Sequence, residues 1–200
     1  MKHLLLYAAL GLNLLTFFSC RSHYALTNIS ENQARDFVVN WPARTKEAAN
    51  TMIAKYGAPH EVTASMLVWR NTGPWKKTVV FKDEVSHHFP VPHTDLLEQF
   101  IDYKVPVGKF DELARYDGSV IVERTKGVMS ARCDKEEMNF LALNLAHDII
   151  TNGKTVDEAR AYYARAAKEF MQGKKDPYTQ GLKFTVPAVR TGDPDMPAKM

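Results

Sequence analysis

The stretch from Asp134 to Thr151 constrains the fold most, because it reads as a helix with apolar residues around most of its circumference. Asp134 and Glu137 have the spacing of a capping box at its start, and Asn152-Gly153 closes it. Its apolar positions are Met138, Phe140, Leu141, Ala142, Leu143, Leu145, Ile149 and Ile150. A helix that is apolar on most sides is expected to be buried. Other elements of the chain must therefore cover it.

Other helices and strands are predicted before and after this helix in the sequence. Further helices are predicted over residues 30–40, 45–56, 109–116 and 155–171. Strands are predicted over residues 65–70, 75–82, 98–105, 119–124 and 128–132, with residues 83–94 irregular and 182–186 as a further edge strand. Because successive strands are joined by short turns, the pattern indicates an antiparallel sheet of about five strands with helices packed on one face. The predicted fold class is α+β, with a helical C-terminal half.

The N-terminus has the pattern of an export signal. Lys2 precedes an apolar run of 15 residues from Leu4 to Phe18, shorter than the roughly 20 residues that span a membrane. Phe17-Phe18-Ser19-Cys20 resembles the lipobox of bacterial lipoproteins, although an aliphatic and a small residue are more usual at the first two positions. The resemblance implies that residues 1–19 are a signal peptide and that Cys20 is acylated.

The predicted domain organisation follows from this signal. Residues 20–29 form a lipidated tether, residues 30–186 a single α+β domain, and residues 187–200 a mobile C-terminal tail rich in Pro and Gly. Arg21 after the cysteine implies sorting to the outer membrane, facing the periplasm, as in Gram-negative lipoproteins. A protein that is secreted or soluble in the periplasm is the alternative. With Cys20 acylated, Cys133 is alone and an intrachain disulfide is excluded.

The charge balance excludes one class of partner. Without Lys2, the mature chain would carry 25 of the 26 Lys and Arg residues against 23 Asp and Glu. No basic run or Arg-rich helix occurs in the sequence, so no nucleic-acid partner is predicted. The expected partners are the membrane, through the N-terminal lipid, and an envelope protein. No cofactor is predicted.

A histidine-rich segment is the densest group of candidate metal ligands. His87, His88 and His93 lie within seven residues, and Asp95 or Glu98 could complete a ligand set. Two observations favour solvated loop histidines instead. Neighbouring residues point apart in an extended chain, and no established zinc-binding spacing is present.

Cys133, the pair His147-Asp148 and the pair Glu136-Glu137 each have both a chemical and a structural interpretation. Cys133 stands at a predicted helix start, where a thiolate could be stabilised, or is a small buried residue at a corner. His147 beside Asp148 suits a histidine at the core boundary better than an acid–base dyad, because adjacent helical residues diverge by about 100°. Glu136 and Glu137 suit the first turn of a helix, where negative charge is favourable.

Two tryptophans flank the predicted turn at residues 71–74. Trp69 and Trp75 could form an exposed recognition surface for a protein or a glycan. In a hairpin, such residues more often pair across the strands over the core. Both interpretations stay open at the level of the sequence.

A local resemblance concerns the segment before Trp69. A helix ending in Lys55-Tyr56-Gly57-Ala58-Pro59, followed by a strand, resembles the opening of SmpA/BamE-like small lipoproteins. Those are outer-membrane proteins of two helices and three strands, and they act as accessory parts of barrel-protein assembly machinery. The resemblance covers about 30 residues, the helical second half has no counterpart in that family, and no functional residue is carried over.

These observations predict a non-catalytic envelope lipoprotein that binds or scaffolds a partner. The first alternative is a small-ligand-binding protein or an enzyme with a site near the loop from His87 to His93. It would use some of His87, His88, His93, Glu98 and Cys133. The second alternative is a metal-binding lipoprotein.

Overall fold

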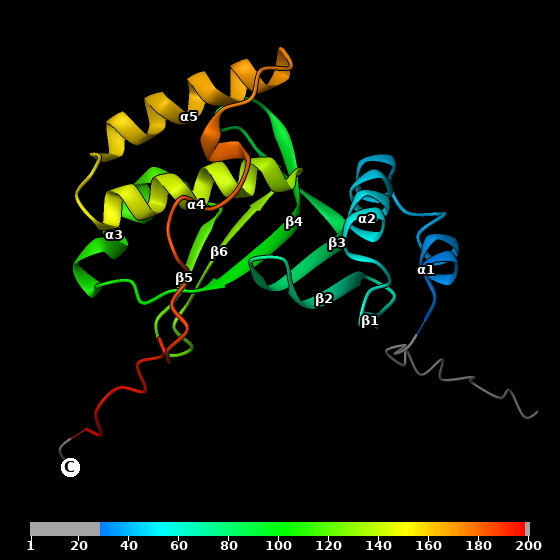
Figure 1. Cartoon of the computed structure of the whole chain (residues 1–200), viewed down its shortest axis with the longest axis horizontal. Helices are drawn as coiled ribbons and strands as arrows, with labels where there is room; N and C mark the ends of the chain where they lie inside the picture. The colour runs from blue at the N-terminus through cyan, green and yellow to red at the C-terminus, as the bar shows by residue number, and fades with distance from the viewer. Residues whose placement is uncertain (1–28, 199–200) are drawn as a thin grey trace, which may run out of the picture.

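The sheet is the organising element of the structure (Figure 1). The computed structural model describes residues 29–198, so the predicted signal peptide and Cys20 lie outside the described residues. Six antiparallel strands lie in the order β1-β2-β3-β4-β6-β5. Their bounds are β1 Glu61–Val62, β2 Met66–Thr72, β3 Trp75–His87, β4 His93–Asp102, β5 Val120–Glu123 and β6 Val128–Cys133. The α+β class is confirmed, with six strands in place of about five.

Five α-helices accompany the sheet: α1 Glu31–Phe37, α2 Ala43–Tyr56, α3 Phe110–Tyr116, α4 Glu136–Ile150 and α5 Val156–Met171. Capping boxes at Ser30 and Thr155 open α1 and α5. The one predicted at Asp134 is wrong, because Lys135 occupies the N-cap position and the Asp134 carboxylate pairs with the Lys135 ammonium group at 2.6 Å. Within residues 29–198, no helix is long and apolar enough to cross a membrane.

The helices pack on one face of the sheet, as predicted. Leu97 on β4 belongs to a core with α1 and α2, whereas Ile101 on the same strand belongs to a core with α3, α4 and α5. Residues four apart on a strand point to the same side, so the two cores share one face. Helix α4 lies between the sheet and α5 (Figure 1). It is buried along nearly its whole length, as its composition predicts.

The long hairpin of β3 and β4 differs from the prediction. Residues 83–94 were expected to be irregular, but β3 continues to His87 and β4 begins at His93. The two strands pair as Val85↔Asp95, Ser86↔Thr94 and His87↔His93, after an irregularity in register between Val80 and Val85. The irregularity interrupts the alternation of apolar and polar residues, and alternation is the signal by which a strand is recognised in a sequence.

The segment of residues 182–186 also departs from expectation. Residues 182–186 are not a strand; the side chain of Asn144 on α4 binds this region through the Tyr178 and Gly181 carbonyls and the Lys183 amide. Further on, in the predicted mobile tail, Thr191 is buried and its hydroxyl donates to the Gly127 carbonyl at 2.6 Å. A Cβ atom at Gly127 would lie 2.2 Å from the Thr191 backbone, so glycine is required at this turn.

Glu136, the first residue of α4, joins the two cores. Its buried carboxylate accepts hydrogen bonds from Lys55 and Tyr56 at the end of α2, from Trp75 Nε1 on β3 at 2.6 Å and from Gln99 Nε2 on β4 at 2.9 Å. Burial alone would raise the pKa of Glu136, but these hydrogen bonds outweigh it and lower the pKa below the usual value of 4.5.

This network yields a prediction. Glu136→Gln should lower the free energy of unfolding at neutral pH by about 2–4 kcal/mol, because it leaves buried donors without a charged acceptor. Since the folded-state pKa is depressed, the carboxylate's contribution is present above about pH 4.5 and is lost as the pH falls through the folded-state value. Urea unfolding across this range should show a smaller loss of stability on acidification in the variant. Glu137→Gln, in the same helical turn, is the control; an equal effect of both variants would contradict the role of Glu136.

Candidate functional site

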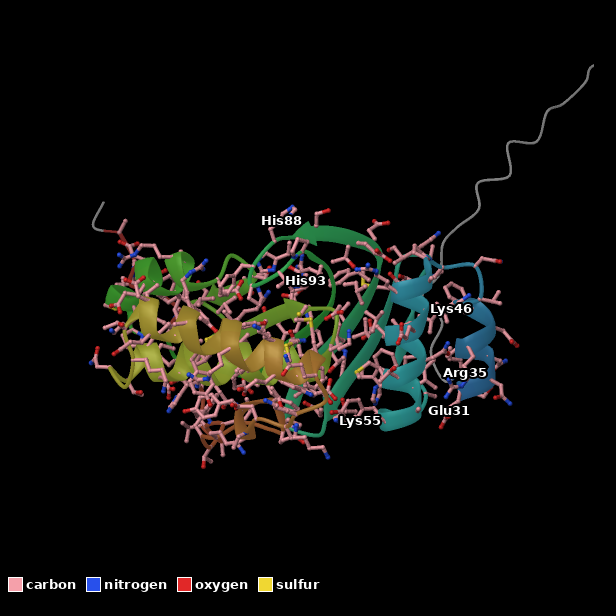
Figure 2. All side chains as sticks on the ribbon, turned by 90° about the horizontal axis from the view of Figure 1, so that it is seen from above. Glu31, Arg35, Lys46, Lys55, His88 and His93 are labelled. Atoms are coloured by element: carbon pink, nitrogen blue, oxygen red, sulfur yellow. The ribbon has the colours of Figure 1, made fainter. Side chains whose placement is uncertain are left out.

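A pocket opens between the helices on the covered side of the sheet. It has a volume of about 730 Å³ and lies between α2, the start of α4, the last turns of α5 and the loop residues 90–93. Figure 2 looks down on this part of the molecule, with Lys55 at the end of α2 and His93 among the labelled residues. The pocket exists because α2 and α5 cover different parts of the same sheet face and do not meet above it.

The wall and the rim of the pocket differ in chemistry. The wall is apolar and includes Ala48, Met52, Leu97, Met138, Tyr163, Ala167 and Phe170. The rim carries charges of both signs: Arg44, Glu47, Lys55, Asp134, Lys135 and Glu137. Two of the rim cations are paired, Lys55 with Glu136 and Lys135 with Asp134. The pocket can therefore enclose an apolar group while a polar group stays at the opening.

A cluster of polar side chains lies at one wall of the pocket, where β3 ends and β4 begins. His87, His93 and Asp95 each offer a ligand atom, and these atoms all lie within 4.8 Å of one another. His87 and His93 face each other across the strand pair with ring centroids 4.9 Å apart. Asp95 joins them because residues two apart on a strand point to the same side. We call these three residues the His–Asp cluster.

Neighbouring residues hold the carboxylate of this cluster. The Ser119 hydroxyl donates to Asp95 Oδ2 and lies 3.4 Å from His87 Nδ1. His87 Nε2 lies 3.6 Å from Asp117 Oδ1, which also accepts from the Ser119 amide at 2.8 Å. Burial raises the pKa of Asp117. Ser119 and Asp117 did not stand out in the sequence, because they precede β5, far along the chain from the histidines.

His93 has two distinct ring nitrogens. Its Nδ1 lies 2.8 Å from the Val91 carbonyl oxygen, which accepts a hydrogen bond from the Nδ1–H group. Its Nε2 lies 3.2 Å from Asp95 Oδ1, but among residues 29–198 neither of these two atoms has a hydrogen-bond partner of good geometry. Asp95, followed by Cys133, raises the pKa of His93 to about 11. His93 and Asp95 therefore form an ion pair.

The structure brings together only part of the predicted metal set. His87 and His93 converge with Asp95, whereas His88 is exposed and lies at the outer margin in Figure 2. Glu98 lies on the other face of the sheet, where it accepts from Ser130 Oγ at 2.7 Å and pairs with Arg132 at 2.8 Å. Of the residues proposed for an enzyme, His87, His93 and Cys133 therefore lie together, whereas His88 and Glu98 lie apart from them.

Cys133 is a buried residue at the corner between β6 and α4. It is 4% exposed, contacts His93 and forms no disulfide with any described residue. Burial raises the pKa of its thiol, and this outweighs the opposite effect of His93. At neutral pH the group is a thiol, and a reactive thiolate is not supported.

His147 and Asp148 do not form a dyad. His147 Nδ1 lies 2.7 Å from the Tyr103 hydroxyl, and the ring stacks on Phe184 at 4.3 Å. Asp148 instead accepts from Lys154 at 2.7 Å and from the Tyr178 hydroxyl at 3.0 Å. His147 is a partly buried histidine at the edge of the core, which agrees with the structural interpretation of the sequence.

The recognition surface expected at Trp69 and Trp75 is absent from this part of the structure, because both side chains are buried, at 0% and 1% exposure. Trp69 Nε1 donates to the Gly57 carbonyl at 2.9 Å, and the Trp75 ring stacks on Phe140 at 4.7 Å. The two residues are not partners across the hairpin; each belongs to a different core. Strand β2 places the Trp69 ring beside the end of α2, and strand β3 places the Trp75 ring against α4.

Comparison with known proteins gave no match: no family model, no curated protein and no solved structure matches this chain. The interpretation of the site therefore depends on its own geometry.

The burial of Cys133 can be tested by alkylation. In the Cys20→Ala chain, where Cys133 is the sole cysteine, iodoacetamide at about pH 8 should modify the folded protein at least tenfold more slowly than the urea-unfolded protein, because the thiol is enclosed and its pKa is raised. Mass spectrometry of timed samples measures the two rates. Equal rates would contradict the buried position.

Proposed function

We propose that this chain is a bacterial envelope lipoprotein whose domain binds a small amphiphilic molecule in the pocket between α2, α4 and α5. The pocket itself carries the proposal. Its volume of about 730 Å³ falls in the range of roughly 300–1,000 Å³ in which small-molecule sites are found. Binding of this kind is the small-ligand alternative of the sequence analysis, with a site next to the loop that precedes His93.

The distribution of side chains supports an amphiphile as the ligand. Met52 and Met138 contribute flexible thioether side chains to the wall, and methionine adapts to apolar ligands of varied shape. The Tyr163 and Phe170 rings add a large apolar area. An apolar chain would fill the interior, while the charged rim would remain beside the polar head group in contact with water.

The proposed location rests on the lipobox resemblance at Cys20. Two or three acyl chains on that residue would hold the protein stably at a bilayer, because each buried methylene contributes about 0.8 kcal/mol. A bilayer is a source of amphiphiles, so the two parts of the proposal are compatible. The predicted envelope partner, the outer-membrane location and the scaffold role stay predictions.

A fluorescent amphiphile tests the pocket. The Cys20→Ala chain should bind 11-(dansylamino)undecanoic acid saturably, with enhanced dansyl emission, because the probe combines an apolar chain with a carboxylate. Ala48→Phe on α2 and Ala167→Phe on α5 place a ring in the pocket and should each weaken binding at least tenfold.

A control for this test lies on the same helix as Ala167. Ala164 is exposed and does not line the pocket, so Ala164→Phe should bind the probe like the parent chain. Circular dichroism shows whether each variant is folded. Absence of saturable binding by the parent chain, or equal binding by folded Ala167→Phe and Ala164→Phe, would contradict the proposed site.

The lipid anchor is tested separately. Cys20→Ala should move the protein from the membrane fraction to the soluble fraction of a Gram-negative host, because the acyl acceptor is removed. Cys133→Ala, which alters a buried residue of the domain, should leave the protein in the membrane fraction. Unchanged membrane association of Cys20→Ala, or an amino terminus beyond residue 20 without acyl mass, would contradict the anchor.

A further inference from the structure

We infer that His87, His93 and Asp95 form a binding site for a divalent transition-metal ion of the zinc class. This site shares His93 with the wall of the amphiphile pocket but does not depend on the proposal made for that pocket. It rests on the positions of three side chains and on two buried polar atoms, close to each other, that form no hydrogen bond within residues 29–198.

These two atoms are His93 Nε2 and Asp95 Oδ1. Among the described residues, both are shielded from solvent and neither has a hydrogen-bond partner, although they lie 3.2 Å apart. Asp95 is 3% exposed. A buried carboxylate oxygen without a partner is costly, so such groups in native proteins usually have a ligand, an ion or a water. A cation between these two atoms would satisfy both.

The orientation of His93 suits a metal ligand. The Val91 carbonyl, 2.8 Å from Nδ1, selects the tautomer with a proton on Nδ1. When a metal ion binds, Nε2, the nitrogen that faces Asp95, would release its proton and donate its lone pair to the ion. Metal-binding histidines generally use one nitrogen for the ion and donate from the other to a carbonyl or a carboxylate.

The spacing of the ligand atoms also fits. Two ligands about 2.1 Å from a tetrahedral zinc ion lie roughly 3.4 Å from each other. The observed separation of His93 Nε2 from Asp95 Oδ1 is 3.2 Å, and His87 Nδ1 lies 3.5 Å from the other oxygen of the same carboxylate, Oδ2. All three ligand atoms are within 4.8 Å of one another, so a small inward shift of His87 would complete the set.

The surrounding structure holds these groups in place. His87 and His93 are cross-strand partners at the end of the hairpin, so the backbone fixes their separation. Ser119 donates to Asp95 Oδ2, which leaves Oδ1 to face His93. Hydrogen bonds of this kind to a ligating carboxylate orient it and strengthen binding.

The donor set indicates the class of ion. Two imidazoles and one carboxylate suit zinc and its neighbours in the first transition row, whereas calcium and magnesium prefer oxygen donors throughout. Three protein ligands leave a coordination position for water or another small ligand. Cys133 contacts His93 but is not within reach of the whole cluster, so a thiolate ligand is not part of the inference.

Cobalt(II) provides a direct test, because its visible absorption reports coordination geometry. The untagged Cys20→Ala chain, treated with a chelator, should bind one equivalent of Co²⁺ with the intense bands of a four-coordinate site, and Zn²⁺ should displace it. His93→Ala and Asp95→Asn should each weaken binding at least roughly 100-fold, since each removes a ligand. His88→Ala, which alters the exposed neighbour of His87, should bind like the parent chain.

Thermal unfolding guards against variants that fail to fold. Zn²⁺ should raise the melting temperature of the parent chain and of His88→Ala, but not that of Asp95→Asn. A parent chain without four-coordinate cobalt bands and without a zinc-induced shift would overturn the inference, as would folded His93→Ala and Asp95→Asn variants that bind like the parent. Ala167→Phe should keep metal binding while it loses the amphiphile probe, so failure of one proposal is distinguishable from failure of the other.

Discussion

The buried carboxylate of Glu136 is the interaction on which the arrangement of the domain depends. It accepts from α2, β3 and β4 while it forms the first turn of α4. Four elements from distant parts of the chain are thereby fixed to one point. Because hydrogen bonds to a buried charge are stronger than neutral ones, this contact sets the position of α2 relative to α4 more firmly than apolar packing alone. The helices cover the sheet as two groups, α1 with α2 and α3 with α4 and α5, and the pocket lies between the two groups.

The same face of the sheet supplies both candidate sites. On β4, alternate residues from His93 to Ile101 point toward the helices. His93 and Asp95 belong to the His–Asp cluster, Leu97 lines the pocket, and Ile101 lies in the core. The turn at the end of the hairpin packs on α5 through Phe89 and Tyr163. The polar residues beside it are enclosed by the loop residues 90–93 and by Asp117, Ser119 and Cys133.

Much of the fold could be predicted from the sequence, because its signals are local. The capping boxes at Ser30 and Thr155 and the apolar composition of α4 give helices where the structure has them. The site could be predicted only in part. The histidines were visible as a cluster, but choosing between His87 and His88 required knowing that β3 reaches this point after an irregular stretch of pairing. Asp117, Ser119 and the acceptor role of Glu136 depend on contacts between residues far apart in the chain, which no local pattern records.

The ordering of strands by length has a consequence for behaviour at high concentration. The two edges of the sheet are formed by β1, with two residues, and β5, with four, whereas the longest strands, β3 and β4, lie inside. An exposed edge strand presents unpaired backbone N–H and C=O groups that can pair with a strand of another molecule, and a short edge strand presents few of them. This sheet is therefore protected against fibril-like growth by its architecture, an advantage for any protein crowded at a surface.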